Sequence, residues 1–113
     1  MSSLSTHVLD AVTGAPATGV RVVLSRRDPA AGEGWAELAS ASTDEDGRIR
    51  DLAPDGLSDG DHRLVFDTGS YFAETGRTGF YPEVAITFTV SDDRHYHVPL
   101  LLSPFAFSTY RGS

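Results

Sequence analysis

Hydrophobic residues recur at every second position in short runs along this chain, the pattern of β-strands that each turn one face to a core. The clearest run is 84–90, in which apolar residues alternate with alanine and threonine. Seven further runs predict strands at 4–9, 20–26, 35–42, around 48–50 and at 62–67, with a closing pair between 95 and 111.

The segments between these runs are rich in glycine, proline and aspartate, which favours turns at 10–19, 28–34 and 51–61. Only residues 68–75 suit a helix, with Thr68 as its expected N-cap and Gly76 as its end. We therefore predict an all-β, two-sheet, eight-stranded β-sandwich with one short helix. A length of 113 residues fits a single domain over residues 1–113.

Composition excludes several kinds of chemistry. The chain has no cysteine, which rules out disulfides, thiolate nucleophiles and cysteine zinc sites. Its formal net charge is −7, and a surface for nucleic acid or an anionic membrane would need the opposite sign. All nine basic residues are arginine and none is lysine, which excludes Schiff-base chemistry on a lysine amine. An anionic ligand would therefore be held by individual guanidinium groups. Neither a signal peptide nor a membrane-length apolar segment is visible, and the expected location is the cytoplasm.

Several polar residues stand where a sandwich would favour apolar ones. His7 lies within the first strand, and Arg48 follows an Asp-Gly turn. His95 and His97 are two positions apart, so both side chains lie on one face of a strand. Each has a structural interpretation as well, because an isolated strand histidine is more often a surface or satisfied polar residue than a catalytic one.

The segment 97–113 ends the chain in an unusual way. An apolar run at 98–102 is broken at Ser103-Pro104, and a second alternating run leads to Tyr110-Arg111-Gly112-Ser113. Chain ends commonly fray into small or charged residues. A tyrosine and an arginine carried by a strand to this position suggest a functional segment.

Five stretches together resemble the 5-hydroxyisourate hydrolases, the transthyretin-like enzymes of urate breakdown. They are LSTHVLDAVTGAPATGVRVVL at the start, then TDEDGR, YFAETG and FYPEV, and finally YHVPLLLSPFAFSTYRGS. The terminal YRGS distinguishes the enzymes from the transthyretins. The departures lie in loops and side positions such as His62, where an aromatic residue is commoner and which we interpret as structural.

The resemblance implies a function: hydrolysis of 5-hydroxyisourate to 2-oxo-4-hydroxy-4-carboxy-5-ureidoimidazoline, without metal or cofactor. It implies a small-molecule substrate and a homotetramer with active sites in a channel between dimers. Partners such as nucleic acid or a membrane are not expected, because of the negative net charge. It assigns catalysis to His7, Arg48 and His97, and substrate binding to Tyr110, Arg111, Gly112 and Ser113.

The chemistry of these side chains suits that assignment. A neutral histidine can take a proton from attacking water near pH 7, and a nearby arginine lowers the histidine pKa and stabilises a developing oxyanion. The residues alone do not decide which histidine is the base.

Two alternatives stay open: a non-catalytic transthyretin-like small-molecule binding module, and a metal-dependent hydrolase with His7, His95 and His97 as ligands.

Overall fold

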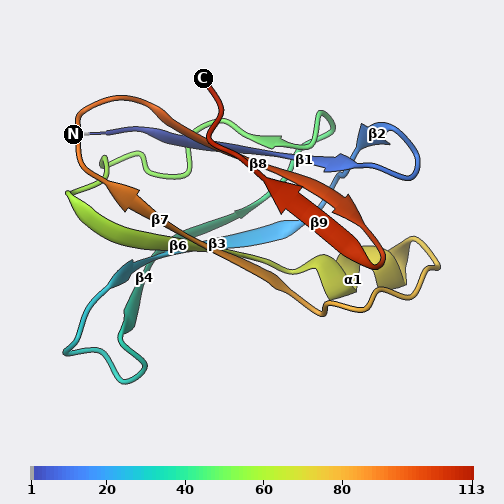
Figure 1. Cartoon of the computed structure of the whole chain (residues 1–113), viewed down its shortest axis with the longest axis horizontal. Coiled ribbons are helices and arrows are strands. Elements are labelled where there is room, and N and C mark those ends of the chain that lie inside the picture. Colours follow the sequence, from blue (N-terminus) through green and yellow to red (C-terminus); the bar gives the residue numbers. More distant parts are fainter. Residues whose placement is uncertain (1) are drawn as a thin grey trace.

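The computed structural model describes residues 2–113, whose strands form two stacked sheets (Figure 1). In the five-stranded sheet, β2, β1, β8 and β9 are neighbours in that order, and β5 also pairs with β1. The four-stranded sheet has the order β4-β3-β6-β7. The strands are β1 (Leu4–Asp10), β2 (Ala15–Pro16), β3 (Arg21–Arg27), β4 (Trp35–Ser42), β5 (Arg48–Ile49), β6 (Gly60–Phe66), β7 (Val84–Val90), β8 (Tyr96–Ser103) and β9 (Ala106–Thr109).

These sheets confirm the predicted all-β sandwich. The structure adds one strand to the eight expected, the two-residue β2, which lies inside the predicted turn at 10–19. It pairs with the end of β1 through Leu9 opposite Pro16. A proline can occupy such a position because a short edge strand does not need its missing N–H.

The core lies between the sheets and follows the period of two. In β1, Leu4, Thr6 and Val8 are buried while the residues between them are half-buried on the outer face. The four-stranded sheet contributes large buried side chains, among them Leu24 and Phe66. The outer face of β1 is thereby left free to carry polar groups.

The predicted helix is present as α1 (Thr68–Glu74), but its N-cap is Asp67 and not Thr68. The Asp67 carboxylate accepts hydrogen bonds from the backbone N–H and the hydroxyl of Ser70, at 3.2 and 2.7 Å. Thr68 is already helical, and its hydroxyl donates to the carbonyl of Tyr81. Gly76 follows the last turn with φ +72°, a conformation that glycine adopts easily.

The buried carboxylate of Asp10 connects α1 to the five-stranded sheet. Asp10 is the last residue of β1, whereas the sequence predicts a turn there. Tyr71 donates to one carboxylate oxygen at 2.9 Å, and Arg77 forms an ion pair with the same group. The carboxylate also accepts from the backbone N–H groups of Val12 and Thr13. This residue therefore shapes the turn after β1 and anchors α1 at once.

His62 lies in the core of the sandwich, on β6. Its side chain is 1% exposed, and its ring stacks on Phe88 with centroids 5.9 Å apart. Within residues 2–113, no helix is long and apolar enough to cross a membrane.

Candidate active site

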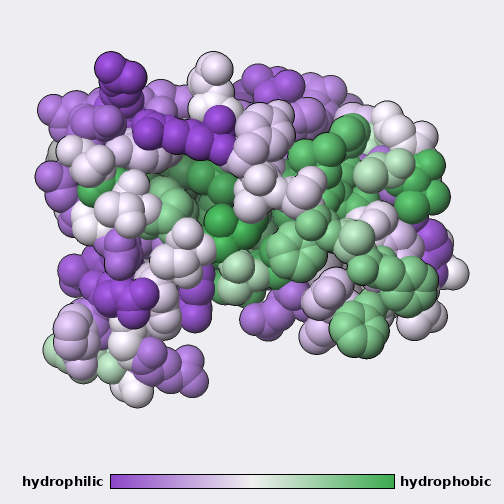
Figure 2. All heavy atoms as spheres, viewed as in Figure 1, coloured by the Kyte–Doolittle hydropathy of each residue, from purple (hydrophilic) through white to green (hydrophobic). Residues whose placement is uncertain are grey.

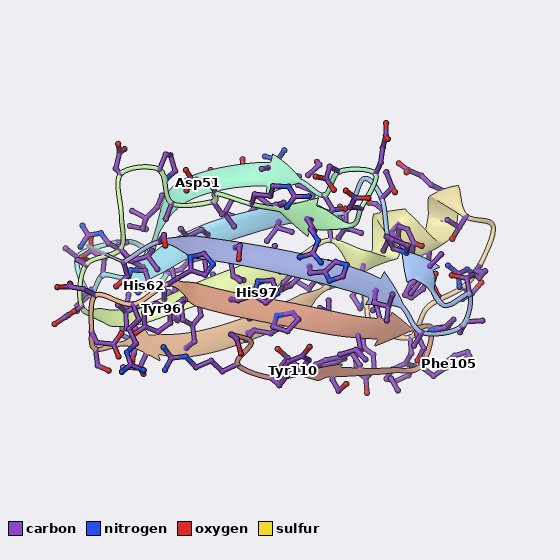
Figure 3. The ribbon with its side chains drawn as sticks, turned by 90° about the horizontal axis from the view of Figure 1, so that it is seen from above. Asp51, His62, Tyr96, His97, Phe105 and Tyr110 are labelled. Atoms are coloured by element: carbon purple, nitrogen blue, oxygen red, sulfur yellow. The ribbon has the colours of Figure 1, made fainter. Side chains whose placement is uncertain are left out.

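Three strands bring His7, Arg48 and His97 onto the outer face of the five-stranded sheet. β1 runs parallel to β8 and antiparallel to β5, so it lies between the other two. His7 is directly opposite Arg48 in β5, while His97 in β8 is opposite Ser5, two residues before His7. Figure 3 looks onto this face and labels His97 on β8. The three residues predicted to be catalytic are therefore near neighbours on one surface.

The acidic turn at 43–47 sets the position of Arg48. The Asp44 carboxylate accepts hydrogen bonds from the backbone N–H groups of Asp46 and Arg48, at 2.8 and 3.0 Å. Gly47 has φ +72°, and a Cβ there would collide with the carbonyl oxygen of Val8. Its own carbonyl accepts from Val8 N–H at 2.8 Å, which fastens the turn to β1. The Asp-x-x-Gly-Arg spacing thus places the arginine beside His7.

His7 and His97 each have a lowered pKa. Burial is the main cause for His7, followed by the positive charge of Arg48, while the backbone of Asp46 and the nearby acidic side chains act in the opposite sense. For His97, burial again comes first, then Arg48, then the neighbouring imidazoles of His7 and His95. A lowered pKa keeps each imidazole neutral near pH 7, the form in which it accepts a proton.

Serine hydroxyls form hydrogen bonds with the rings of His95 and His97, and neither serine was among the predicted site residues. Ser5 Oγ lies 2.7 Å from His97 Nδ1 and 2.8 Å from His95 Nε2, and Ser3 Oγ lies 2.6 Å from His95 Nδ1. The alternation of β1 does put Ser5 on the face of His7, so a signal existed. A serine is too common on strand surfaces to stand out without its partners.

The segment 110–113 approaches the site through Gly112. Its backbone N–H donates to the carbonyl of His97 at 2.8 Å, and a Cβ at this position would overlap the His97 ring. Ser113 is exposed beyond it, and Tyr110 is 60% exposed.

Arg111 points away from the imidazoles in this structure. Its guanidinium carbon lies 4.5 Å above the ring centre of Tyr96. Tyr96 is only 3% exposed and belongs to the inner face of β8. The structure thus groups His7, Arg48, His97 and Gly112, and leaves the Arg111 side chain on the other side of the strand.

The metal-dependent alternative needs several ligand side chains to converge. Across residues 2–113, no three histidine, aspartate or glutamate side chains form a group that could hold a metal ion. Two of the three histidines proposed as ligands are instead joined through Ser5.

Comparison with known proteins identifies the class to which this sandwich belongs. The sequence pattern of the HIUase/Transthyretin family matches residues 4–112. A 5-hydroxyisourate hydrolase of Caulobacter vibrioides is 48% identical over the full length of both chains. One from Mus musculus is 45% identical over 99% of this chain and 96% of its own. The chain belongs to the HIUase/transthyretin family.

Solved structures agree on the fold. The 5-hydroxyisourate hydrolase of Klebsiella pneumoniae superposes with a TM-score of 0.88 at 41% identity, covering 100% of this chain and 94% of the other. A transthyretin from Sparus aurata gives 0.87 at 32% identity, covering 96% of this chain and 95% of its own. The hydrolases and the transthyretins thus share this sandwich. The fold therefore does not distinguish the two classes, and the side chains must do so.

Proposed function

We propose that this protein hydrolyses 5-hydroxyisourate to 2-oxo-4-hydroxy-4-carboxy-5-ureidoimidazoline, a step of urate degradation. The observation that carries the proposal is the pair of neutral imidazoles, His7 and His97, beside the guanidinium of Arg48 on one sheet face. The relatives named for this activity, at 45–48% identity over nearly the whole chain, support it. A non-catalytic binding module would have no need for this grouping of base and cation.

Ring opening requires a base, a stabilised oxyanion and a proton for the leaving nitrogen. One imidazole takes a proton from water as the oxygen attacks a ring carbonyl. The imidazolium formed in this way returns that proton to the nitrogen as the C–N bond breaks, with the second imidazole assisting the transfer. Arg48 stabilises the negative charge on the carbonyl oxygen, and its fork of N–H donors suits a planar, carbonyl-rich ring. His7, Arg48 and His97 are therefore our proposed catalytic residues.

We assign substrate binding to Tyr110, Arg111, Gly112 and Ser113. The contact between Gly112 and His97 supports this assignment, because it brings the segment to the edge of the catalytic face. For Arg111 the assignment rests on family resemblance, since its guanidinium lies over Tyr96 here.

We also propose that the protein assembles as a homotetramer with the catalytic face lining a channel between subunits. Strands β7 and β9 lie at the edges of their sheets, and exposed edges invite pairing with another chain. Aromatic side chains are exposed near β9, and Figure 2 shows apolar side chains gathered on that side of the molecule. They are Phe80, Tyr81, Phe105 and Phe107.

Light scattering at assay concentration would test the assembly, and cell fractionation would test the expected cytoplasmic location.

The activity is tested by generating 5-hydroxyisourate from urate with a urate oxidase and following its decay by absorbance. Added protein should accelerate the decay, and the product should carry the ureido and carboxyl groups of the opened ring. Exhaustive chelation should leave the rate unchanged. Loss on chelation with recovery on adding zinc would instead support the metal-dependent alternative.

A further inference from the structure

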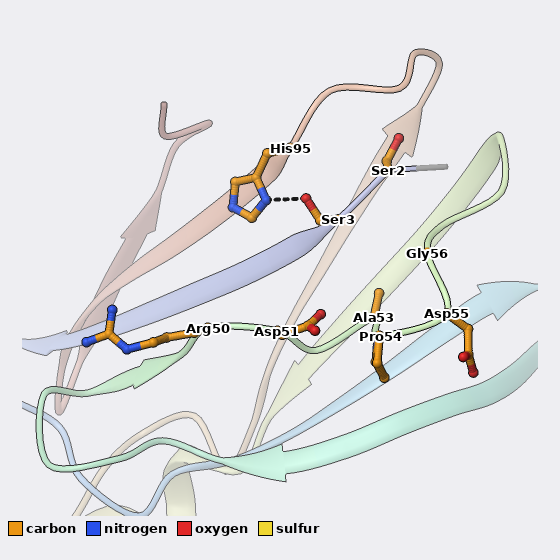
Figure 4. Close-up of a pocket in the computed structure, with 9 residues that line it drawn as sticks. All are labelled: Ser2, Ser3, Arg50, Asp51, Ala53, Pro54, Asp55, Gly56 and His95. Atoms are coloured by element: carbon orange, nitrogen blue, oxygen red, sulfur yellow. Dashed lines mark hydrogen bonds between the residues drawn. The ribbon is translucent and has the colours of Figure 1, made fainter.

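Two serines and two histidines form a continuous hydrogen-bonded chain along the edge of the catalytic face. The links are Ser3 Oγ to His95 Nδ1 at 2.6 Å, His95 Nε2 to Ser5 Oγ at 2.8 Å, and Ser5 Oγ to His97 Nδ1 at 2.7 Å. Figure 4 shows the first link, between the segments that precede β1 and β8. The parallel pairing of β1 with β8 places these side chains next to one another. Ser5 is opposite His97, and the same register continues N-terminally, where Ser3 lies beside His95.

This chain leads from the site to solvent. His97 is half-buried, whereas Ser3 and His95 are exposed. Both exposed residues line a cleft of about 560 Å³ between the start of β1 and the loop at 50–56. Charged groups face the two ends: Arg48 near His97, and Arg50 with acidic neighbours from the loop in the cleft beside His95.

The hydroxyl of Ser5 makes the two imidazoles interdependent. It has a single proton and a nitrogen on each side, so it donates to one imidazole and accepts from the other. When Ser5 donates to His95 Nε2, it accepts from His97 Nδ1–H. His97 Nε2 is then unprotonated and can act as a base. When every bond in the chain reverses, His97 carries its proton on Nε2 instead. The direction of the chain thus sets the tautomer of His97.

The reaction also releases a proton that has to leave the site. Water adds across a ring C–N bond, one hydrogen goes to the ureido nitrogen, and the new carboxyl group ionises at neutral pH. A ureido nitrogen is not basic, so one proton is released for each ring opened.

We propose that Ser5 and His95 form a proton relay that carries this proton from His97 to solvent. His97 Nε2 binds the proton, and Nδ1–H passes to Ser5 Oγ. The Ser5 hydroxyl proton passes to His95 Nε2, His95 Nδ1–H passes to Ser3 Oγ, and the Ser3 proton leaves to water. Each group gains and loses one proton, so charge and atoms balance. Ser5 and His95 act through His97 and are positioning residues, and this inference rests on the proposed function.

The test compares Ser5→Val with Ser5→Thr, since threonine keeps the hydroxyl and valine keeps only the shape. We expect Ser5→Val to lower kcat on the order of 10-fold with little change in KM, and Ser5→Thr to recover most of that loss. Added imidazole buffer should raise kcat of Ser5→Val, because it can accept the proton from His97, and should not affect the wild type. His95→Ala should behave like Ser5→Val, with a smaller loss than His97→Ala. Wild-type turnover in Ser5→Val, or equal losses in both Ser5 variants without response to imidazole, would overturn the relay.

A second measurement needs no substrate. Nitrogen-15 NMR of the histidine rings should show His97 protonated on Nδ1 in the wild type and in Ser5→Thr, and shifted toward Nε2 protonation in Ser5→Val. An unchanged tautomer in Ser5→Val would overturn the relay whether or not the protein hydrolyses 5-hydroxyisourate. Lack of hydrolysis by the wild type would contradict the proposed function separately.

Discussion

Gly112 lies so close to the imidazole of His97 that a side chain at this position would overlap the ring. Its N–H also bonds to the carbonyl of His97 at 2.8 Å, so backbone and ring are both constrained. The absence of a side chain is therefore a requirement of the site.

Replacing Gly112 with alanine should displace the His97 ring and lower turnover by about 10²-fold, the cost expected for a shift of about 1 Å. Gly32→Ala is the matched control, because a Cβ there meets nothing within 4 Å. We expect the control to keep wild-type kinetics. Normal activity in Gly112→Ala would show that the contact with His97 does not matter for catalysis.

The activity should depend on pH through the lowered pKa values of His7 and His97. Because their neutral forms are the active ones, kcat/KM should be flat around pH 7–8 and fall as pH drops below the ordinary histidine value of about 6.5. Arg48→Gln removes a positive charge that lowers both pKa values, so its acid limb should move to higher pH. A pH–rate profile of each protein measures this. An acid limb that stays in place in Arg48→Gln would mean that Arg48 does not influence the base.

The buried carboxylate of Asp10 should contribute to stability above about pH 4. Burial alone would raise its pKa, but hydrogen bonds from Arg77, Tyr71 and two backbone N–H groups outweigh it and lower the pKa to about 2. The depressed value means that the contribution is present above the unfolded-state pKa and disappears as pH falls from about 4 to 2. The shift corresponds to about 2 kcal/mol at pH 7.

Urea unfolding of Asp10→Asn at pH 7 should therefore show a loss of about 2 kcal/mol, and the difference from wild type should shrink toward pH 2. The exposed Asp51, labelled in Figure 3, provides the control Asp51→Asn, which should stay within about 0.5 kcal/mol of wild type. Equal stability of Asp10→Asn and wild type at pH 7 would contradict the assignment.

The sequence predicted the two sheets well because strand periodicity is local. The helix and the shared face of His95 and His97 could be predicted for the same reason, because both follow from local sequence pattern. What it could not show is which strands are neighbours: the approach of His7 to Arg48 depends on β5 pairing with β1, and that of Ser5 to His97 on the parallel pairing of β1 with β8.

Long-range polar contacts were also beyond reach. Asp10 appeared to be an ordinary turn residue, because its partners Tyr71 and Arg77 are more than sixty positions away. The burial of His62 likewise depends on its packing against Phe88 from the neighbouring strand. In contrast, the grouping of His7, Arg48 and His97 was expected from family resemblance and not from periodicity.

Removal of Tyr110 to Ser113 should abolish most activity while leaving the fold intact. These residues are largely exposed, and their deletion should change the free energy of unfolding by tenths of a kcal/mol, as for most surface residues. Turnover should fall by about 10²-fold because substrate is no longer held in register. Arg111→Ala should reproduce most of the loss, and Arg94→Ala, also exposed, should not. Full turnover by the truncated protein at an unchanged melting temperature would refute a role for this segment.

The most direct test is the initial rate of 5-hydroxyisourate decay with wild type and with His7→Ala, Arg48→Ala and His97→Ala. Each substitution should lower kcat by about 10²-fold or more, the scale of general-base and oxyanion groups, without loss of fold by circular dichroism. Arg21→Ala, on an exposed position of the other sheet, should retain the wild-type rate. If wild type does not accelerate the decay, or if the three variants accelerate it as well as wild type does, these side chains are not the catalytic site.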